Sequence, residues 1–256
     1  MLFIADRFKR TALEVQEYVR LVAAAFRASF SRPWYRYDIV EQFDAIGVQS
    51  LTVVLLTGFF TGAVLALQGG LTLDQFGARP VVGRLVSASM IKNLGPVLTG
   101  LMLCGRVGSG IAAELGSMVV TDQINALRAL GTDPIRKLVV PRILAGILMA
   151  PVLTVVADFV GIVGGWIVAR FQLQVPSGLY WSSILRGLYM QDVWMGLLKP
   201  FALGFVIVSV ACHVGLRTTG GTQGVGKATT KAVVIGSVGV IAMDFFLTRI
   251  MISLWY

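Results

Sequence analysis

The stretch GGTQGVGKATT, residues 220–230, comes nearest to a known chemical motif in this sequence. It nearly matches the phosphate-binding pattern G-x-x-x-x-G-K-[ST], with Lys227 in register and Ala228 where the motif needs a magnesium-binding hydroxyl. A true phosphate-binding loop follows a buried strand, whereas an apolar run long enough to cross a membrane precedes this stretch. We therefore interpret it as a glycine-rich turn, after which a membrane helix starts at Thr229 and Thr230.

Residues that usually carry catalysis or bind metal ions are scarce. The sole histidine, His213, has no evident cysteine or serine partner in the sequence. Cys104 and Cys212 lie in apolar runs without the spacing of a metal site. We expect no catalytic site, no metal site and no cofactor bound to this chain itself.

Charged residues inside apolar segments are costly in a bilayer and therefore mark candidate functional positions. Four stand out: Lys92, Asp158, Lys199 and Asp244. Each of the two lysines could attract the phosphate of a lipid headgroup, although Lys199 lies near a span end and could equally extend to the interface. We expect the two aspartates to pair with basic residues such as Arg106 or Arg249.

The composition places the chain in a membrane. Hydrophobic residues make up 56% of the 256, charged residues make up 14%, and the mean hydropathy is +0.79, whereas about a quarter of the residues of a soluble domain are charged. We predict an all-α integral membrane protein with five spans, at about 20 apolar residues per crossing. The predicted spans cover residues 48–71, 85–105, 138–169, 195–216 and 232–255.

Residues 1–47 are predicted to form a separate N-terminal unit, an amphipathic interfacial helix with a connector, ahead of a five-span domain over 48–256. Apolar residues recur along this helix at spacings of three and four, which places them on one face: Phe8, Ala12, Val15, Val19, Val22 and Phe26. Charged residues occupy the other faces, so we expect the helix to lie in the headgroup region. Packing against a soluble partner is the alternative.

The first predicted span carries small residues four positions apart, at Gly58, Gly62 and Ala66. Such a face permits close approach of another helix. It fits either dimerisation or packing within the chain.

The distribution of basic residues predicts the orientation of the chain. With a cytoplasmic N-terminus, fifteen of the 22 Lys and Arg residues fall on the inside and five on the outside. This bias predicts a cytoplasmic N-terminus and a C-terminus on the opposite side of the membrane. The same dispersion between apolar segments argues against nucleic acid as the reason for the net charge of +9.

The loop over residues 105–142 joins the second and third spans and is too polar to cross the membrane. Its apolar residues predict a helix with one apolar face that ends at Gly131, before a turn at Asp133 and Pro134. A short amphipathic helix on the cytoplasmic side suits docking to an ATP-driven subunit. Packing against the membrane core is the alternative.

Several stretches together resemble the MlaE-type permease family, the membrane subunits of ABC systems that move phospholipid between bacterial membranes. They are LQGG at 67–70, LGPVLTGLMLCGRVGSGIAAELG at 94–116, TDQINAL with DPIRKLVVPR, GGTQGVGKATTKAVV, and DFFLT at 244–248. The resemblance covers nearly all of the chain after the N-terminal helix. It implies that the near-match to a phosphate-binding loop is a feature of the permease, and that ATP and magnesium bind a separate ATPase.

The resemblance also implies an assembly in the bacterial inner membrane. The expected partners are a second copy of the chain, two ABC ATPase subunits, a hexameric MCE-domain lipid-binding protein and, as an accessory, a STAS-domain protein. The substrate implied is phospholipid. On this basis residues 48–256 form a five-span permease domain, with its N-terminus cytoplasmic and its C-terminus periplasmic.

Two sets of site residues follow from the resemblance and from the charges within the spans. The expected lipid-binding positions are Leu65, Thr72, Leu73, Phe76, Lys92, Asn93 and Lys199. Many relatives carry an acidic residue at the position of Asn93, so no carboxylate acts there in this chain. A coupling helix over residues 114–130 is expected to contact the ATPase through Glu114, Asp122, Gln123 and Leu127.

Two other functions are compatible with a five-span chain. A secondary transporter or channel is expected to contain inverted repeats and paired broken helices, and no convincing repeat is found. A membrane anchor for a complex would tolerate replacement of the charges within its spans. Lipid headgroup preference and the direction of transport stay open.

Overall fold

The computed structural model describes residues 2–29 and 35–255, and in residues 2–11 it describes the backbone only. Every regular element in this described part is helical. Five helical stretches there are long and apolar enough to cross a membrane, which confirms the predicted all-α membrane protein. The stretches are Arg36–Asp74, Arg79–Val120, Ile135–Phe171, Met190–Leu216 and Gly221–Trp255.

The stretches are built from consecutive helices with short interruptions. The α-helices are α1 (Leu2–Ser29), α2 (Arg36–Ile46), α3 (Leu51–Asp74), α4 (Val82–Ser89), α5 (Gly95–Leu103), α6 (Ser109–Val120), α7 (Gln123–Ala129), α8 (Val140–Phe171), α9 (Ser177–Gly187), α10 (Met190–Leu216) and α11 (Gly221–Trp255). Between them lie 3-10 turns at Val48–Ser50 and Arg79–Val81 and π-helical turns at Met90–Leu94, Cys104–Gly108 and Ile135–Val139. The spans exceed their predicted lengths because the polar residues beside each apolar run stay helical, which keeps the backbone hydrogen bonds satisfied at the membrane boundary.

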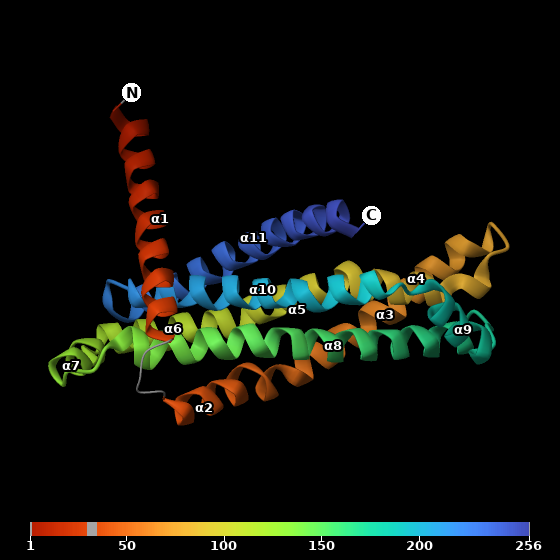
Figure 1. The fold of residues 1–256 in the computed structure, drawn as a ribbon, viewed down its shortest axis with the longest axis horizontal. Helices are drawn as coiled ribbons and strands as arrows, with labels where there is room; N and C mark the ends of the chain where they lie inside the picture. The colour runs from red at the N-terminus through yellow and green to blue at the C-terminus, as the bar shows by residue number, and fades with distance from the viewer. Residues whose placement is uncertain (1, 30–34, 256) are drawn as a thin grey trace.

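The arrangement has two distinct ends. In Figure 1 the long helices lie side by side along the length of the molecule, and α1 stands across one end. α7 and the turn between α10 and α11 lie at this end, which we call the α7 end. α9 and the connection from α3 to α4 lie at the opposite end, the α9 end.

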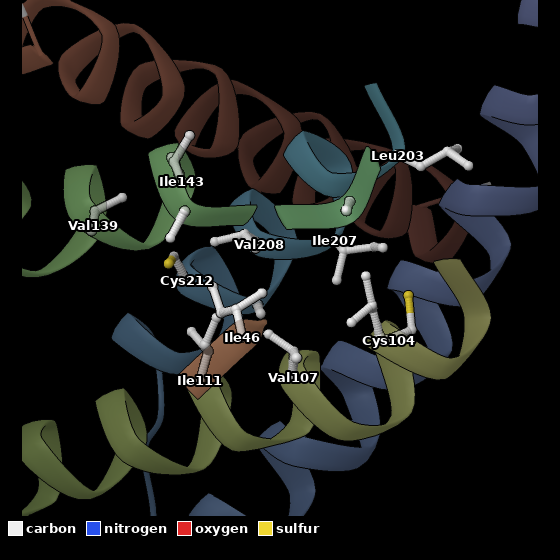
Figure 2. Packing of buried hydrophobic residues seen from close by; sticks show 14 of the residues in the cluster. Ile46, Cys104, Val107, Ile111, Val139, Ile143, Leu203, Ile207, Val208 and Cys212 are labelled. Carbon is white, nitrogen blue, oxygen red and sulfur yellow. The ribbon is translucent and has the colours of Figure 1, made fainter. Parts of the chain in front are cut away.

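The main core is formed by side chains from all five spans. Figure 2 shows part of it, in which α10 contributes Leu203, Ile207, Val208 and Cys212. Of the most apolar window of α10, 72% is buried, against 11% for α11. α10 is therefore the central helix, whereas α11 exposes most of its apolar surface to lipid or to another subunit.

The small-residue face of α3 packs against α8, which decides between the two uses considered for it. A Cβ atom added to Gly62 would lie 1.8 Å from the carbonyl oxygen of Gly161, and one added to Gly58 would lie 2.7 Å from that of Ala157. The two backbones approach so closely that a larger residue at either position must separate the helices. This face therefore serves packing within the chain.

The predicted coupling helix over residues 114–130 is wrong as a single helix. α6 ends at Val120, and α7 starts at Gln123 after Asp122, whose φ of +57° lies in the left-handed region. Aspartate tolerates this conformation better than most residues, because its short side chain bonds locally; here it accepts a bond from Asn125 at 3.0 Å. The predicted stop at Gly131 is confirmed by its φ of +75°.

The predicted helix start at Thr229 and Thr230 is also wrong. α11 begins at Gly221, after a turn in which the φ angles of Gly220 and Gly221 are +91° and +65°. Glycine adopts such angles without steric cost. The two threonine hydroxyls donate to the Gly226 carbonyl, as they do inside helices rather than at caps. The near-match to a phosphate-binding loop is thus helical from Gly221 onward.

Part of the apolar face predicted for the N-terminal helix borders a groove beside the bundle, although Val19 and Phe26 are 56% and 68% exposed. Val19, Val22 and Phe26 of α1 line an apolar groove of about 520 Å³ together with residues of α8 and α10. Tyr18 also reaches the bundle, where its hydroxyl lies 2.8 Å from Ser209 Oγ. The side chain of Phe8, assigned to the same face, lies outside the described part.

Replacing Gly62 by Ala is expected to destabilise the protein. The added methyl group cannot be accommodated beside the Gly161 carbonyl, and overpacking of this kind costs about 1–3 kcal/mol. The matched control is Gly226→Ala, where the new methyl group meets nothing within 4 Å. Thermal unfolding in detergent should show a lower Tm for Gly62→Ala alone; equal Tm values for the two variants would contradict the close packing of α3 on α8.

Candidate functional site

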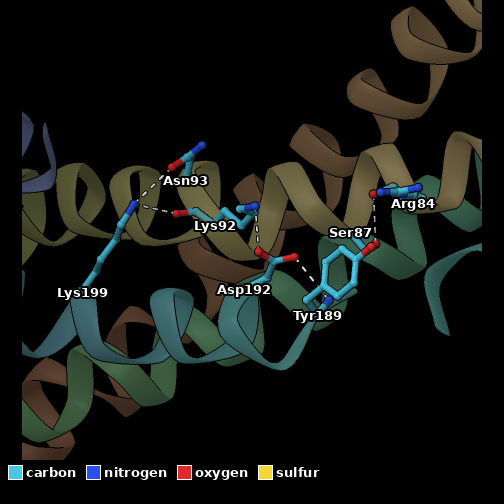
Figure 3. Close-up of polar contacts among 7 residues, drawn as sticks. All are labelled: Arg84, Ser87, Lys92, Asn93, Tyr189, Asp192 and Lys199. Atoms are coloured by element: carbon cyan, nitrogen blue, oxygen red, sulfur yellow. Dashed lines mark hydrogen bonds and ion pairs between the residues drawn. The ribbon is translucent and has the colours of Figure 1, made fainter. Parts of the chain in front are cut away.

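The π-helical turn Met90–Leu94 organises a group of charged side chains within the membrane spans. In a regular helix the carbonyl of Lys92 would accept a bond from the backbone of residue 96, but Pro96 has no N–H. The Lys92 carbonyl instead accepts a hydrogen bond from Lys199 Nζ at 2.7 Å. Lys199 also donates to Asn93 Oδ1 at 3.1 Å, as Figure 3 shows.

Lys199 is completely buried, so it does not extend to the interface as one alternative held. Its ammonium group lies 3.1 Å from Asp244 Oδ1 on α11. With the two acceptors on the π-helical turn, this ion pair compensates a charge that would be very costly in hydrocarbon. Lys199 thereby connects the second, fourth and fifth spans.

The expected pairing of Asp244 with a basic residue is confirmed, but its partner is Lys199 and not Arg106 or Arg249. Arg106 instead donates to three acceptors near the start of the first span: the Ala45 carbonyl, Ser50 Oγ and Gln49 Oε1. Arg106 therefore has hydrogen-bond acceptors on the first span and does not pair with Asp244. Asp158 is buried, and its Oδ1 atom has no hydrogen-bond partner in the described part of the chain.

A second ion pair involves an aspartate that sequence reasoning missed. Lys92 Nζ lies 2.7 Å from Asp192 Oδ1, and the Asp192 side chain is 3% exposed. Asp192 also accepts a bond from the backbone N–H of Tyr189 at 3.3 Å, at the start of α10. The signal in the sequence was the spacing of three residues between the helix cap Tyr189 and the carboxylate of Asp192. It was missed because the predicted span began only at residue 195.

Three expected lipid positions, Leu65, Thr72 and Leu73, lie on α3 toward the α9 end, and Phe76 lies in the turn that follows. The four face different surroundings. Leu65 and Leu73 pack against a core cluster that includes Met90, the first residue of the π-helical turn. Thr72 is exposed and its hydroxyl donates to the Gln68 carbonyl, and Phe76 is 78% exposed in the turn after α3. Leu65 and Leu73 are thus near the charged group, whereas Thr72 and Phe76 face outward.

The expected coupling residues lie at the α7 end. Asp122, just before α7, and Gln123, its first residue, are both exposed. α7 itself lies at one end of the bundle (Figure 1). Leu127 instead packs against the main core, which holds α7 to the bundle. The four residues therefore divide into an outward pair and two anchors, Leu127 and Glu114.

Glu114 fastens α6 to the start of α8. Its carboxylate lies 2.5 Å from Arg142 Nη2, and the Arg142 side chain is almost fully buried. Arg142 Nη1 also donates to the Leu138 carbonyl at 2.7 Å. A buried arginine needs a counter-ion, and Glu114 is the one that Arg142 has. The pair therefore holds α6 in a fixed position on α8.

Removing the charge of Lys199 is expected to destabilise the bundle. Lys199→Met leaves Asp244 without a counter-ion, and breaking a buried pair on one side costs about 3–5 kcal/mol. The double variant Lys199→Met with Asp244→Asn should regain part of the lost Tm in detergent, because no charge is then left unpaired. A double variant that is less stable than Lys199→Met alone would show that the ion pair is not the interaction lost.

Comparison with known proteins covers most of the chain. The family described as Permease MlaE matches residues 39–250. A probable ABC transporter permease protein of Rickettsia conorii is 39% identical over 247 residues, which cover 96% of this chain and 95% of that protein. The intermembrane phospholipid transport system permease protein MlaE of Haemophilus influenzae is 37% identical over 230 residues, which cover 88% of each chain.

A plant protein shares the same region. Protein TRIGALACTOSYLDIACYLGLYCEROL 1, chloroplastic, of Arabidopsis thaliana is 34% identical over 211 residues, which cover 82% of this chain and 60% of that protein. The family match includes the second, third and fourth membrane-spanning stretches in full, most of the first and the last, the charged group around Met90–Leu94 and the α6–α7 turn. The chain therefore belongs to the MlaE permease family.

Proposed function

We propose that this chain is the permease subunit of an ATP-driven ABC transporter that moves phospholipid between the inner and outer membranes of a bacterium. The observation that carries the proposal is the family match over residues 39–250, together with 37% identity to a permease of an intermembrane phospholipid transport system. Five apolar helical stretches suit a multi-pass subunit of the inner membrane. No observation favours a secondary transporter, a channel or a simple anchor.

The proposed complex contains two copies of the chain, two ATPase subunits that hold ATP and magnesium, a hexameric MCE-domain protein and a STAS-domain accessory. The exposed apolar surface of α3 supports a contact with a second copy, since only 28% of the most apolar window of the first span is buried within the chain. The N-terminus is proposed to be cytoplasmic and the C-terminus periplasmic. The excess of basic residues on one side supports this orientation, which makes the α7 end cytoplasmic.

The proposed mechanical path runs from the ATPase to the lipid positions through α8. An ATPase that contacts α7 at Asp122 and Gln123 would displace α6, and the pair of Glu114 with Arg142 would pass the movement to α8. α8 packs closely on α3, so α3 must follow. α3 carries Leu65, Thr72 and Leu73 toward its far end, and Phe76 follows in the next turn.

The proposed lipid contacts divide by chemistry. Leu65, Leu73 and Phe76 offer apolar surface for acyl chains, with Thr72 as a polar neighbour. Lys92, whose side chain is 30% exposed, is the charged group best placed to meet a headgroup phosphate. Asn93 and Lys199 support it by holding the π-helical turn in place.

The proposed function is tested by reconstituting the complex, isolated from its own membrane, in vesicles that contain labelled phospholipid. We expect transfer of the label to acceptor vesicles only when ATP is hydrolysed. A complex that hydrolyses ATP and transfers no phospholipid would exclude the proposal.

Glu114→Gln tests the mechanical path in the same assay. Loss of a charge-assisted hydrogen bond of about 1.5–3 kcal/mol should lower ATP-driven transfer about tenfold while the ATPase subunits stay bound. Ser117→Ala is the matched control, because Ser117 is exposed on the same helix and its side chain makes no hydrogen bond in the described part. Transfer by Glu114→Gln at the rate of the control would contradict coupling through α8.

A further inference from the structure

A polar cleft opens at the α7 end, where α1 crosses the end of α10 and the start of α11. Its volume is about 420 Å³, and its lining includes His213, Arg217, Lys227, Lys231 and Glu14. A second, shallow apolar groove of about 660 Å³ lies beside it on the exposed side of α11, and all of its lining residues belong to this helix, Val234 and Ile235 among them. Lys227 and Lys231 line both spaces.

Positive charge is in excess around the cleft. Glu14 of α1 pairs with Lys231 at 3.2 Å, and Glu17 of α1 pairs with Arg217. Lys227 has neither an ion pair nor a hydrogen bond within the described residues. Lys227 and Lys231 are four residues apart on one face of α11, where like charges repel each other. An anion between them would relieve this repulsion.

The α11 N-terminus adds to the attraction for an anion. The helix begins at Gly221, next to the cleft, so the positive end of its dipole points toward this region. The lysine side chains supply the charge-assisted hydrogen bonds that a phosphate accepts. The helical backbone cannot wrap around a phosphate, which distinguishes this site from a nucleotide-binding loop.

The apolar groove identifies the kind of anion. A headgroup phosphate in the polar cleft would have its acyl chain beside Val234 and Ile235, and the exposed apolar face of α11 continues in the same direction through Val238 and Ile241. A free phosphate or a nucleotide would leave this groove unused. Polar and apolar spaces that share two lysines match an amphiphile with a negatively charged head.

We propose that this cleft binds an anionic phospholipid of the surrounding leaflet through its phosphate, at the end of the bundle opposite the lipid positions of α3. The site does not depend on the proposed transport function. Glu14 and Glu17 compete with the lipid for Lys231 and Arg217. Bound lipid would therefore replace ionic contacts between α1 and the bundle, while the contact of Tyr18 with Ser209 can remain.

The test is native mass spectrometry of the detergent-purified chain titrated with phosphatidylglycerol, and with phosphatidylcholine for comparison. Lys227→Gln should weaken phosphatidylglycerol binding about tenfold, because a hydrogen bond to a charged group is lost. Glu14→Gln should tighten binding, because Lys231 is released from its competitor. The matched control Arg249→Gln removes an exposed charge near the other end of α11 and should leave binding unchanged.

The two variants are expected to change phosphatidylglycerol binding in opposite directions, whereas a folding defect would weaken binding in both. Equal losses for Lys227→Gln and Arg249→Gln would show general charge attraction and overturn the proposal. Weaker binding by Glu14→Gln would do the same, even if Lys227→Gln failed to fold. Inorganic phosphate or ATP that displaced phosphatidylglycerol at equal concentration would assign the cleft to a free phosphate instead of a lipid.

Discussion

The cost of a charge in hydrocarbon is the constraint around which this bundle is built. Lys199 lies within the most buried of the five spans, and its ammonium group is acceptable there only because two hydrogen-bond acceptors and the Asp244 carboxylate surround it. One of them exists because Pro96 leaves a carbonyl without its usual donor. The irregular second span and α11 thus both contribute to holding one buried amine.

Close backbone contact connects this charged group to the rest of the molecule. α3 and α8 approach through residues without side chains, so they behave as one rigid element rather than two sliding helices. At one end this element is fastened to the α6–α7 segment by the pair of Glu114 with Arg142. At the other it carries apolar side chains beside the π-helical turn. A displacement at either end must therefore involve the other.

Hydropathy was sufficient to predict the fold class, the number of spans and four of the charged residues within them, but not Asp192. It could not supply partners, because Lys92 and Asp192 are a hundred positions apart and meet only in three dimensions. Helix propensity also failed to predict two helix boundaries. One is the break at Asp122, where a single residue adopts an unusual conformation, and the other is the start of α11, where polar residues extend the helix. The local stop at Gly131 was predictable, since it requires no distant contact.

The order of the acceptors along the chain has a consequence for biogenesis. A membrane protein is inserted from its N-terminus as it is synthesised, so Lys92 and Asn93 precede Lys199, while Asp244 is made last. The fourth span therefore enters the bilayer with two neutral acceptors ready and its counter-ion still missing. The insertion of α11 then supplies Asp244 as the counter-ion of the ammonium group. Until the final span is in place, a quality-control protease acting on the incomplete bundle would thus meet an ammonium group that has no counter-ion.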